Sequence, residues 1–385
     1  MIAALLGAAL ALAPARTLAP ARTLAPARAL ATARADTLTD TVFVVSNRRR
    51  IAEGFTREVT DSLWYGLYVT RNVTGNVTDS ATGNHASRAL AAMRVTRIDS
   101  AALDEGAWRA RLAAATGDTA SRQAALVFVH GYSSSPGTAV AQGVQVRARG
   151  AHRGPLVVFL WPTHDLYVTI PTPARAYRDD ARTAALSGPA LARVLRAVGA
   201  IAPTVVLVAH SMGSRVALDA MLGDTATRTQ LVARPLRAVG LFSPDVGAER
   251  FRADFSPALP TVAHRIALYG ASTDYLLGAA AIVNGERRAS GITRRGAALA
   301  GIELVDDTRG QRAEPLLLTL VGPRHSVRWA SAALADFFGI VVAGADPSCR
   351  VTGATADAEG EGRWRLRRDT MPSGWLGAGC APLQP

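Results

Sequence analysis

The chain has 385 residues, of which 49% are hydrophobic, so it is long enough to bury the core of one large domain with appendages. A formal net charge of +13 would ordinarily indicate nucleic acid or an anionic surface as a partner. All 43 basic residues are arginines spread along the chain, and no base-reading motif accompanies them, so we expect no nucleic acid partner. The lack of lysine excludes P-loop, kinase, pyridoxal Schiff-base and Ser-Lys chemistry.

Residues 1–40 are predicted to stand apart from the folded domain. Ile2 to Ala13 is an apolar run too short to span a bilayer but of the length of a signal-peptide core. The LAPART repeat that follows cannot bury enough side chain to fold. A signal peptide with a repeat-expanded tail and a mis-set start codon both fit. We favour export to the periplasm or the cell exterior over a cytoplasmic location.

The remaining chain alternates apolar strands with helical patterns. Such alternation predicts an α/β fold, a doubly wound and mostly parallel sheet with helices on both faces. We expect this domain over 41–340. The strands are expected near 41–46, 63–70, 93–98, 125–130, 156–161, 204–209, 236–242, 265–270 and 315–321, and the helices near 137–149, 174–199, 212–223 and 326–338.

The most informative segment is VVLVAHSMGSRVALDAM at 205–221, an apolar strand, a Ser between small residues and an amphipathic helix. This is the layout of a nucleophile elbow, in which a tight turn between strand and helix exposes the Ser. The positions two before and two after the Ser must be small, and they are Ala209 and Gly213. Ser211 is therefore the predicted nucleophile.

A nucleophilic Ser needs a general base at the same edge of the sheet. Only His264 and His325 follow Ser211 in separate segments. His264 precedes an apolar run, so it would lie at the start of a strand, at the opposite edge. His325 follows the apolar run 315–321 and is the predicted base.

The acid that orients this base is predicted by the same edge argument. Asp274 and Asp245 each follow an apolar run between Ser211 and His325. Both give the chain order Ser, Asp, His of a hydrolase triad, and Asp274 is preferred because it is one strand further from the elbow and comes directly before the strand that carries His325. Asp245 stays open as the alternative acid; its simpler role is a helix cap or a hydrogen-bond acceptor in a loop.

The oxyanion hole needs a second main-chain N–H beside the one that follows the nucleophile. In ALVFVHGYSSS at 125–135 a strand runs into a turn at Gly131, which directs the next N–H toward the site. Tyr132 and Met212 are therefore the predicted donors. His130 and His210 lie inside these two motifs and are expected to pack beneath the nucleophile.

These residues resemble the α/β-hydrolase superfamily, and within it the bacterial esterase/lipase-like α/β hydrolases of unknown function. The one departure is Ala209, where the broad pattern has Gly. The resemblance implies a Ser-His-Asp hydrolase site and no cofactor. It extends over roughly 42–340 and rests on VFVVSNRRR at 42–50, LWYGLYVTR at 63–71, VFVHGYSSS at 127–135, FLWPTHD at 159–165, Tyr177 with Asp180, LVAHSMGSR at 207–215, FSPDVGAERF at 242–251, LYGASTDYLL at 268–277 and RHS at 324–326.

Residues 341–385 form a predicted C-terminal tail that holds the only two cysteines. Cys349 and Cys380 either close one disulfide, which suits an exported protein, or are free thiols. No GxGxxG, HExxH or CxxC spacing appears, so no dinucleotide or zinc site is expected.

We expect a serine hydrolase that cleaves carboxylic esters of small molecules or lipids, without a stable membrane span. Two alternatives stay open: an acyltransferase that uses the same acyl-enzyme, and a non-catalytic hydrolase-like binding module. The site is expected to have a small cap or none. Trp161, Tyr167 and Tyr275 are candidate wall residues, although packing is the commoner role of such aromatics.

Overall fold

The computed structural model describes residues 37–52, 54–73, 94–117, 124–164, 173–272, 274–293, 297–308, 331–345, 355–356 and 362–366. By its contacts the chain divides into two units, Met1–Arg34 and Ala35–Pro385, and every described residue belongs to the second. Several predictions concern residues outside the described ranges: Tyr167, the strand at 315–321, His325, Cys349 and Cys380.

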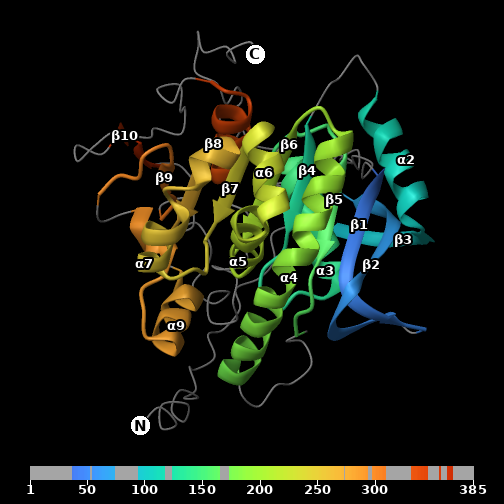
Figure 1. Ribbon diagram of the computed structural model, residues 1–385, viewed down its shortest axis with the longest axis horizontal. Coiled ribbons are helices and arrows are strands. Elements are labelled where there is room, and N and C mark those ends of the chain that lie inside the picture. The colour runs from blue at the N-terminus through green and yellow to red at the C-terminus, as the bar shows by residue number, and fades with distance from the viewer. Residues whose placement is uncertain are drawn as a thin grey trace, which may run out of the picture. The chain divides into compact units, whose positions relative to one another are not determined.

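One mixed, mostly parallel sheet of eleven strands forms the centre of the fold, in the order β10-β11-β9-β8-β7-β6-β4-β5-β1-β2-β3. In Figure 1 it runs from β9 at the left to β1 and β2 at the right. The strands are β1 (Thr37–Ile51), β2 (Gly54–Val73), β3 (Arg94–Leu103), β4 (Ala125–Val129), β5 (Leu156–Leu160), β6 (Val205–His210), β7 (Leu236–Phe242), β8 (Ala263–Gly270), β9 (Glu303–Asp306), β10 (Thr355–Ala356) and β11 (Arg363–Arg365).

The seven strands that lie between β1 and β9 in the sheet, with these two included, are parallel to one another. β1 pairs in parallel with β5, β4 lies between β5 and β6, and β7, β8 and β9 follow β6 in order. β2 and β3 extend the sheet beyond β1 as an antiparallel pair. The order therefore reverses between β4 and β6, and in open α/β sheets such a switch point is where ligands bind.

Both faces of the sheet are covered, and the central strands are correspondingly almost continuous apolar runs rather than alternating ones. Every residue of β4, β5 and β6 is buried. One face packs against α2 (Glu105–Thr116), α4 (Pro173–Ile201) and α5 (Gly213–Leu218), and the other against α3 (Pro136–Arg149) and α11 (Ser331–Asp336). Figure 1 shows α4 crossing in front of the strands. The doubly wound α/β sheet predicted from the sequence is confirmed.

The other helices are short and connect the strands. α5 continues into the π-helical turn η2 (Asp219–Gly223), and α11 continues into η5 (Phe337–Val342). The remaining elements are α6 (Thr225–Ala233), α7 (Ala248–Arg250), η3 (Phe251–Phe255), α8 (Leu259–Val262), α9 (Tyr275–Asn284) and η4 (Ala289–Thr293).

Helix α4 is long and apolar enough, by length and composition, to cross a membrane. In this fold 56% of its most apolar stretch is buried, and residues such as Leu191 and Val198 belong to the main core cluster. This burial is what a core helix of an α/β domain shows.

Several details of the sequence prediction need correction. β1 begins at Thr37, inside the segment 1–40 that was predicted to stand apart from the folded domain. The strand after β8 in the described chain is β9 (Glu303–Asp306), which was not predicted. β10 and β11 were not predicted either, and they join the sheet although they lie in the predicted tail. The helices α2, α6 and α9 were also not predicted, and α9 directly follows Asp274. Helix α9 forms one wall of the cavity beside Ser211.

Candidate active site

Ser211 lies on a sharp turn between β6 and α5, with a φ of +51°. A non-glycine residue in this left-handed region is uncommon, and such strain gathers at functional sites. The main-chain N–H of Ser211 donates to the oxygen of Phe242 at 2.9 Å, and its own oxygen accepts from the N–H of Asp245 at 3.1 Å. The turn therefore has the strained strand-to-helix geometry of a nucleophile elbow.

Two glycines allow the elbow to pack closely on the end of β4. A Cβ on Gly131 would lie 2.9 Å from Nδ1 of His210 and 3.1 Å from Cβ of Ser211. A Cβ on Gly213 would overlap the main-chain oxygen of His130 and lie 2.8 Å from the oxygen of Val129. The small residues that the motif requires are therefore needed for contact with neighbouring backbone.

Replacing Gly213 by alanine is expected to lower the free energy of unfolding by about 2 kcal/mol, because the added methyl group meets backbone that cannot move away. Gly223 is the matched control, since a Cβ there would meet nothing within 4 Å. Gly223→Ala is expected to stay within about 1 kcal/mol of the wild type. Urea unfolding of both variants measures the difference; equal losses would contradict the packing argument.

Ser211 opens into a cavity of about 250 Å³ whose walls are mainly apolar. One wall is α9, one is the start of α4, and the loop after β4 closes the side. The lining residues are Tyr132, Ala174, Tyr177, Ser211, Asp245, Leu276, Leu277, Ala279, Ala280 and Val283. The cavity therefore offers a hydrophobic surface directly beside the hydroxyl of Ser211.

The two predicted oxyanion donors lie at the ends of β4 and β6, on adjacent strands. Met212 is the residue before the first turn of α5, where main-chain N–H groups have no partner within the helix. Tyr132 lines the same cavity as Ser211, and its ring meets that of Tyr177 edge to face at 5.8 Å. Burial, with the nearby charge of Asp180, raises the pKa of Tyr132 to about 12, so its side chain stays neutral.

The alternative acid, Asp245, is the centre of a buried polar network. Its Oδ1 accepts from Nε of Arg288 at 2.6 Å, and its Oδ2 accepts from the hydroxyl of Tyr177 at 2.6 Å and from Nη2 of Arg215 at 3.2 Å. Asp245 is only 1% exposed, and Arg288 is 5% exposed. This network commits both carboxylate oxygens to structural partners, so Asp245 has a larger role than the cap or loop acceptor weighed above.

The preferred acid, Asp274, lies after β8 and is also buried, at 6% exposure. Its Oδ1 accepts from the N–H of Leu277 at 3.0 Å, so the carboxylate caps the N-terminus of α9. Asp274 does not line the cavity of Ser211. The carboxyl ends of β6 and β8 are at the same edge of the sheet, on either side of β7.

The histidines differ in burial and in their distance from Ser211 along the sheet. His264 is exposed at the start of β8, at the edge opposite Ser211, as expected. His130 is fully buried and stacks on Trp161 with the ring centroids 5.3 Å apart. Burial, with the charge of Arg48, lowers the pKa of His130 to about 3, so the ring is neutral. The predicted base, His325, lies outside the described residues.

Of the candidate wall aromatics, Trp161 packs in the core, which is the commoner role weighed above. Its side chain is fully buried, and its Nε1 donates to the oxygen of His130 at 2.8 Å. Tyr275 is the first residue of α9, and its side chain is outside the described part of the structure. The apolar wall comes instead from the small and aliphatic residues of α9.

A His–Asp pair that the sequence argument did not assign lies on the loop after β5. Nδ1 of His164 is 2.5 Å from Oδ1 of Asp180, and the main-chain N–H of His164 donates to the same carboxylate. Asp180 lies in α4 and is fully buried. The resemblance included both members, His164 within FLWPTHD at 159–165 and Asp180 with Tyr177, but gave no reason to pair them.

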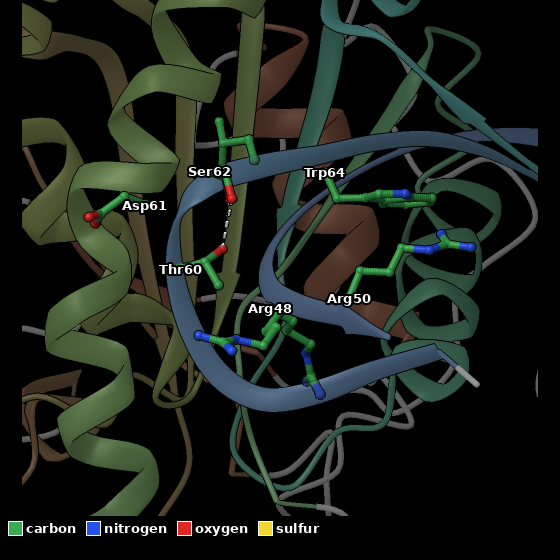
Figure 2. A pocket seen from close by; sticks show the side chains of 8 residues that line it. Arg48, Arg50, Thr60, Asp61, Ser62 and Trp64 are labelled. Carbon is green, nitrogen blue, oxygen red and sulfur yellow. Dashed lines mark hydrogen bonds between the residues drawn. The ribbon is translucent and has the colours of Figure 1, made fainter. Parts of the chain in front are cut away.

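A second cavity, of about 680 Å³, lies in the hairpin of β1 and β2 (Figure 2). The guanidinium of Arg50 stacks over the ring of Trp64 at 5.1 Å, and Arg49 pairs with Glu58 at 2.5 Å. This cavity is polar and holds no Ser, His and Asp together. Within the described ranges, no three His, Cys, Asp or Glu side chains gather as metal ligands. The cavity of Ser211 is therefore the candidate active site.

The sheet order, the elbow after β6 and its strained Ser together define the α/β-hydrolase class of protein. A family model described as alpha/beta hydrolase of unknown function (DUF900) matches residues 107–318, more than half of the chain. The chain belongs to this family, which confirms the resemblance seen in the sequence. No curated protein and no solved structure matches the sequence.

Proposed function

We propose that the protein is a serine hydrolase of carboxylic esters, acting through an acyl-enzyme on Ser211. The observation that carries this proposal is the strained Ser211 at the mouth of an apolar cavity. A nucleophile beside a hydrophobic wall suits a substrate with an apolar acyl group next to an electrophilic carbonyl.

In this proposal each residue has one role. Ser211 attacks the acyl carbon while His325 takes its proton, and Asp274 holds the imidazole in the required tautomer. The main-chain N–H groups of Tyr132 and Met212 stabilise the oxyanion. His325 returns the proton to the leaving alcohol, and water then attacks the acyl-enzyme to release the acid. No cofactor takes part in these steps.

The walls of the cavity indicate the expected acyl chain. The cavity of about 250 Å³ has mainly apolar walls, which suit an acyl chain longer than acetate. We expect a panel of p-nitrophenyl esters of rising chain length to show a higher kcat/KM for medium-length acyl chains than for the acetate ester. If none of the esters in the panel is hydrolysed, the proposed function is contradicted. Alcohol acceptors added to the assay distinguish hydrolysis from acyl transfer, because the two reactions form different products.

Filling the cavity is expected to shift this preference. Val283→Trp places a large ring in the wall, so kcat/KM for long chains should fall at least about 10-fold relative to the acetate ester. Ile282, its neighbour in α9, is 84% exposed and supplies the control Ile282→Trp, which should keep the wild-type preference. The same chain-length profile in both variants would show that the acyl group binds elsewhere.

A further inference from the structure

A network of buried side chains holds the loop that follows β4, where Tyr132 lies. Thr163 comes from the loop after β5 and is 2% exposed. Its Oγ1 accepts from the main-chain N–H of Ser134 at 3.1 Å and donates to the oxygen of Ser134 at 2.7 Å. One hydroxyl therefore holds both main-chain groups of a single residue, two positions after Tyr132.

Arg48, near the end of β1, adds a second tie. Its Nε donates to the oxygen of Trp161 at 3.0 Å, and its Nη2 donates to the oxygen of Ser134 at 3.0 Å and to Oγ1 of Thr163 at 3.2 Å. The residue is 4% exposed, whereas the next two arginines of β1 are exposed. Burying a guanidinium costs free energy of folding unless its N–H groups find hydrogen-bond acceptors. The contacts with Trp161, Ser134 and Thr163 supply such acceptors and fix the loop after β4 in return.

Asp180 holds Ser133, the residue between Tyr132 and Ser134. Its carboxylate accepts from the main-chain N–H of Ser133 as well as from His164. Ser133 has a φ of +57°, a strained conformation that persists only when its surroundings fix it. Thr163, Arg48 and Asp180 thus belong to three separate elements, and all of them act on the two residues directly after Tyr132.

Oxyanion donors stabilise a transition state only if they are held in place before the reaction. We propose that Thr163, together with Arg48 and Asp180, is a positioning residue that fixes the loop so that the N–H of Tyr132 points at the developing oxyanion. This inference rests on the proposed function, because it concerns the donor that the proposal assigns to Tyr132.

The experiment compares Thr163→Val with Thr163→Ser in the full chain. Valine has nearly the same shape but no hydroxyl, so it loses the hydrogen bonds to Ser134; serine keeps them. We expect Thr163→Val to lower kcat for the best p-nitrophenyl ester by about 100-fold with KM within about twofold, since a misplaced oxyanion donor affects only the transition state. Thr163→Ser should stay within about threefold of the wild type.

A transition-state analogue gives a second readout. Inhibition by an alkylboronic acid should weaken in Thr163→Val in parallel with kcat, while circular dichroism stays unchanged. If Thr163→Val does not fold, Thr163→Ala is measured in its place with the same expected loss. An unchanged kcat, or a rise in KM alone, in an active enzyme overturns the positioning role and leaves the proposed function standing. A wild-type protein inert to esters and to the boronic acid overturns both.

Discussion

Ser211→Ala is expected to abolish ester hydrolysis, with a fall in kcat of about 10⁵-fold or more, because removing the nucleophile of a triad removes the acyl-enzyme route. The thermal midpoint should not fall appreciably, since the substitution removes one hydroxyl and the site has room for the alanine side chain. The measurement is turnover of one p-nitrophenyl ester together with a thermal melt.

Ser243 supplies a matched control for this substitution. It follows the next strand, β7, is 3% exposed and has a φ of +45°. Its main-chain N–H donates to the oxygen of Tyr269, just as that of Ser211 donates to Phe242. Ser243 is not among the residues that line the cavity, so Ser243→Ala should keep turnover within a fewfold of the wild type. Retained turnover in Ser211→Ala would remove the proposed nucleophile.

Asp274→Asn is expected to cost about four orders of magnitude in kcat, because the amide no longer holds the imidazole in the required tautomer. Asp245→Asn should cost much less in kcat. It should instead lower the free energy of unfolding by about 3 kcal/mol, because the buried guanidinium of Arg288 loses its buried charged partner and keeps Glu286, which is more exposed.

The two variants are compared on one ester, with rates expressed per folded molecule. Urea unfolding measures stability, and circular dichroism confirms the folded fraction under assay conditions. If Asp245→Asn loses turnover and Asp274→Asn keeps it, the acid of the triad is Asp245 and the assignment to Asp274 is wrong, while Ser211 and His325 stand.

The sequence predicted the central strands well because they are continuous apolar runs. β4, β5, β6 and β7 lie within one residue of their expected bounds. β9 was missed because four residues are too few for a clear pattern. α9 was missed for the opposite reason: YLLGAAAIVN is apolar on every face, so it shows no helical periodicity, although it is the helix that lines the site.

At the site, the sequence identified the residues of one continuous motif and missed the contacts between residues far apart in the chain. Ser211 and its small neighbours form a continuous motif whose geometry follows from the strand and helix around it. The partners of Asp245 are far away in sequence: Tyr177 is 68 residues before it and Arg288 is 43 residues after it. The contacts of Thr163 and Arg48 with Ser134 likewise join two loops and the end of β1, and nothing in one segment reveals its partner in another.

The most direct test of the account is covalent labelling of the wild-type protein with a fluorophosphonate, followed by peptide mapping in a mass spectrometer. Such probes react with an activated serine and not with ordinary hydroxyls. We predict one adduct per chain, on Ser211, with none in Ser211→Ala and unchanged labelling in Ser243→Ala. The absence of an adduct, or an adduct on another residue, would contradict the claim that Ser211 is an activated nucleophile.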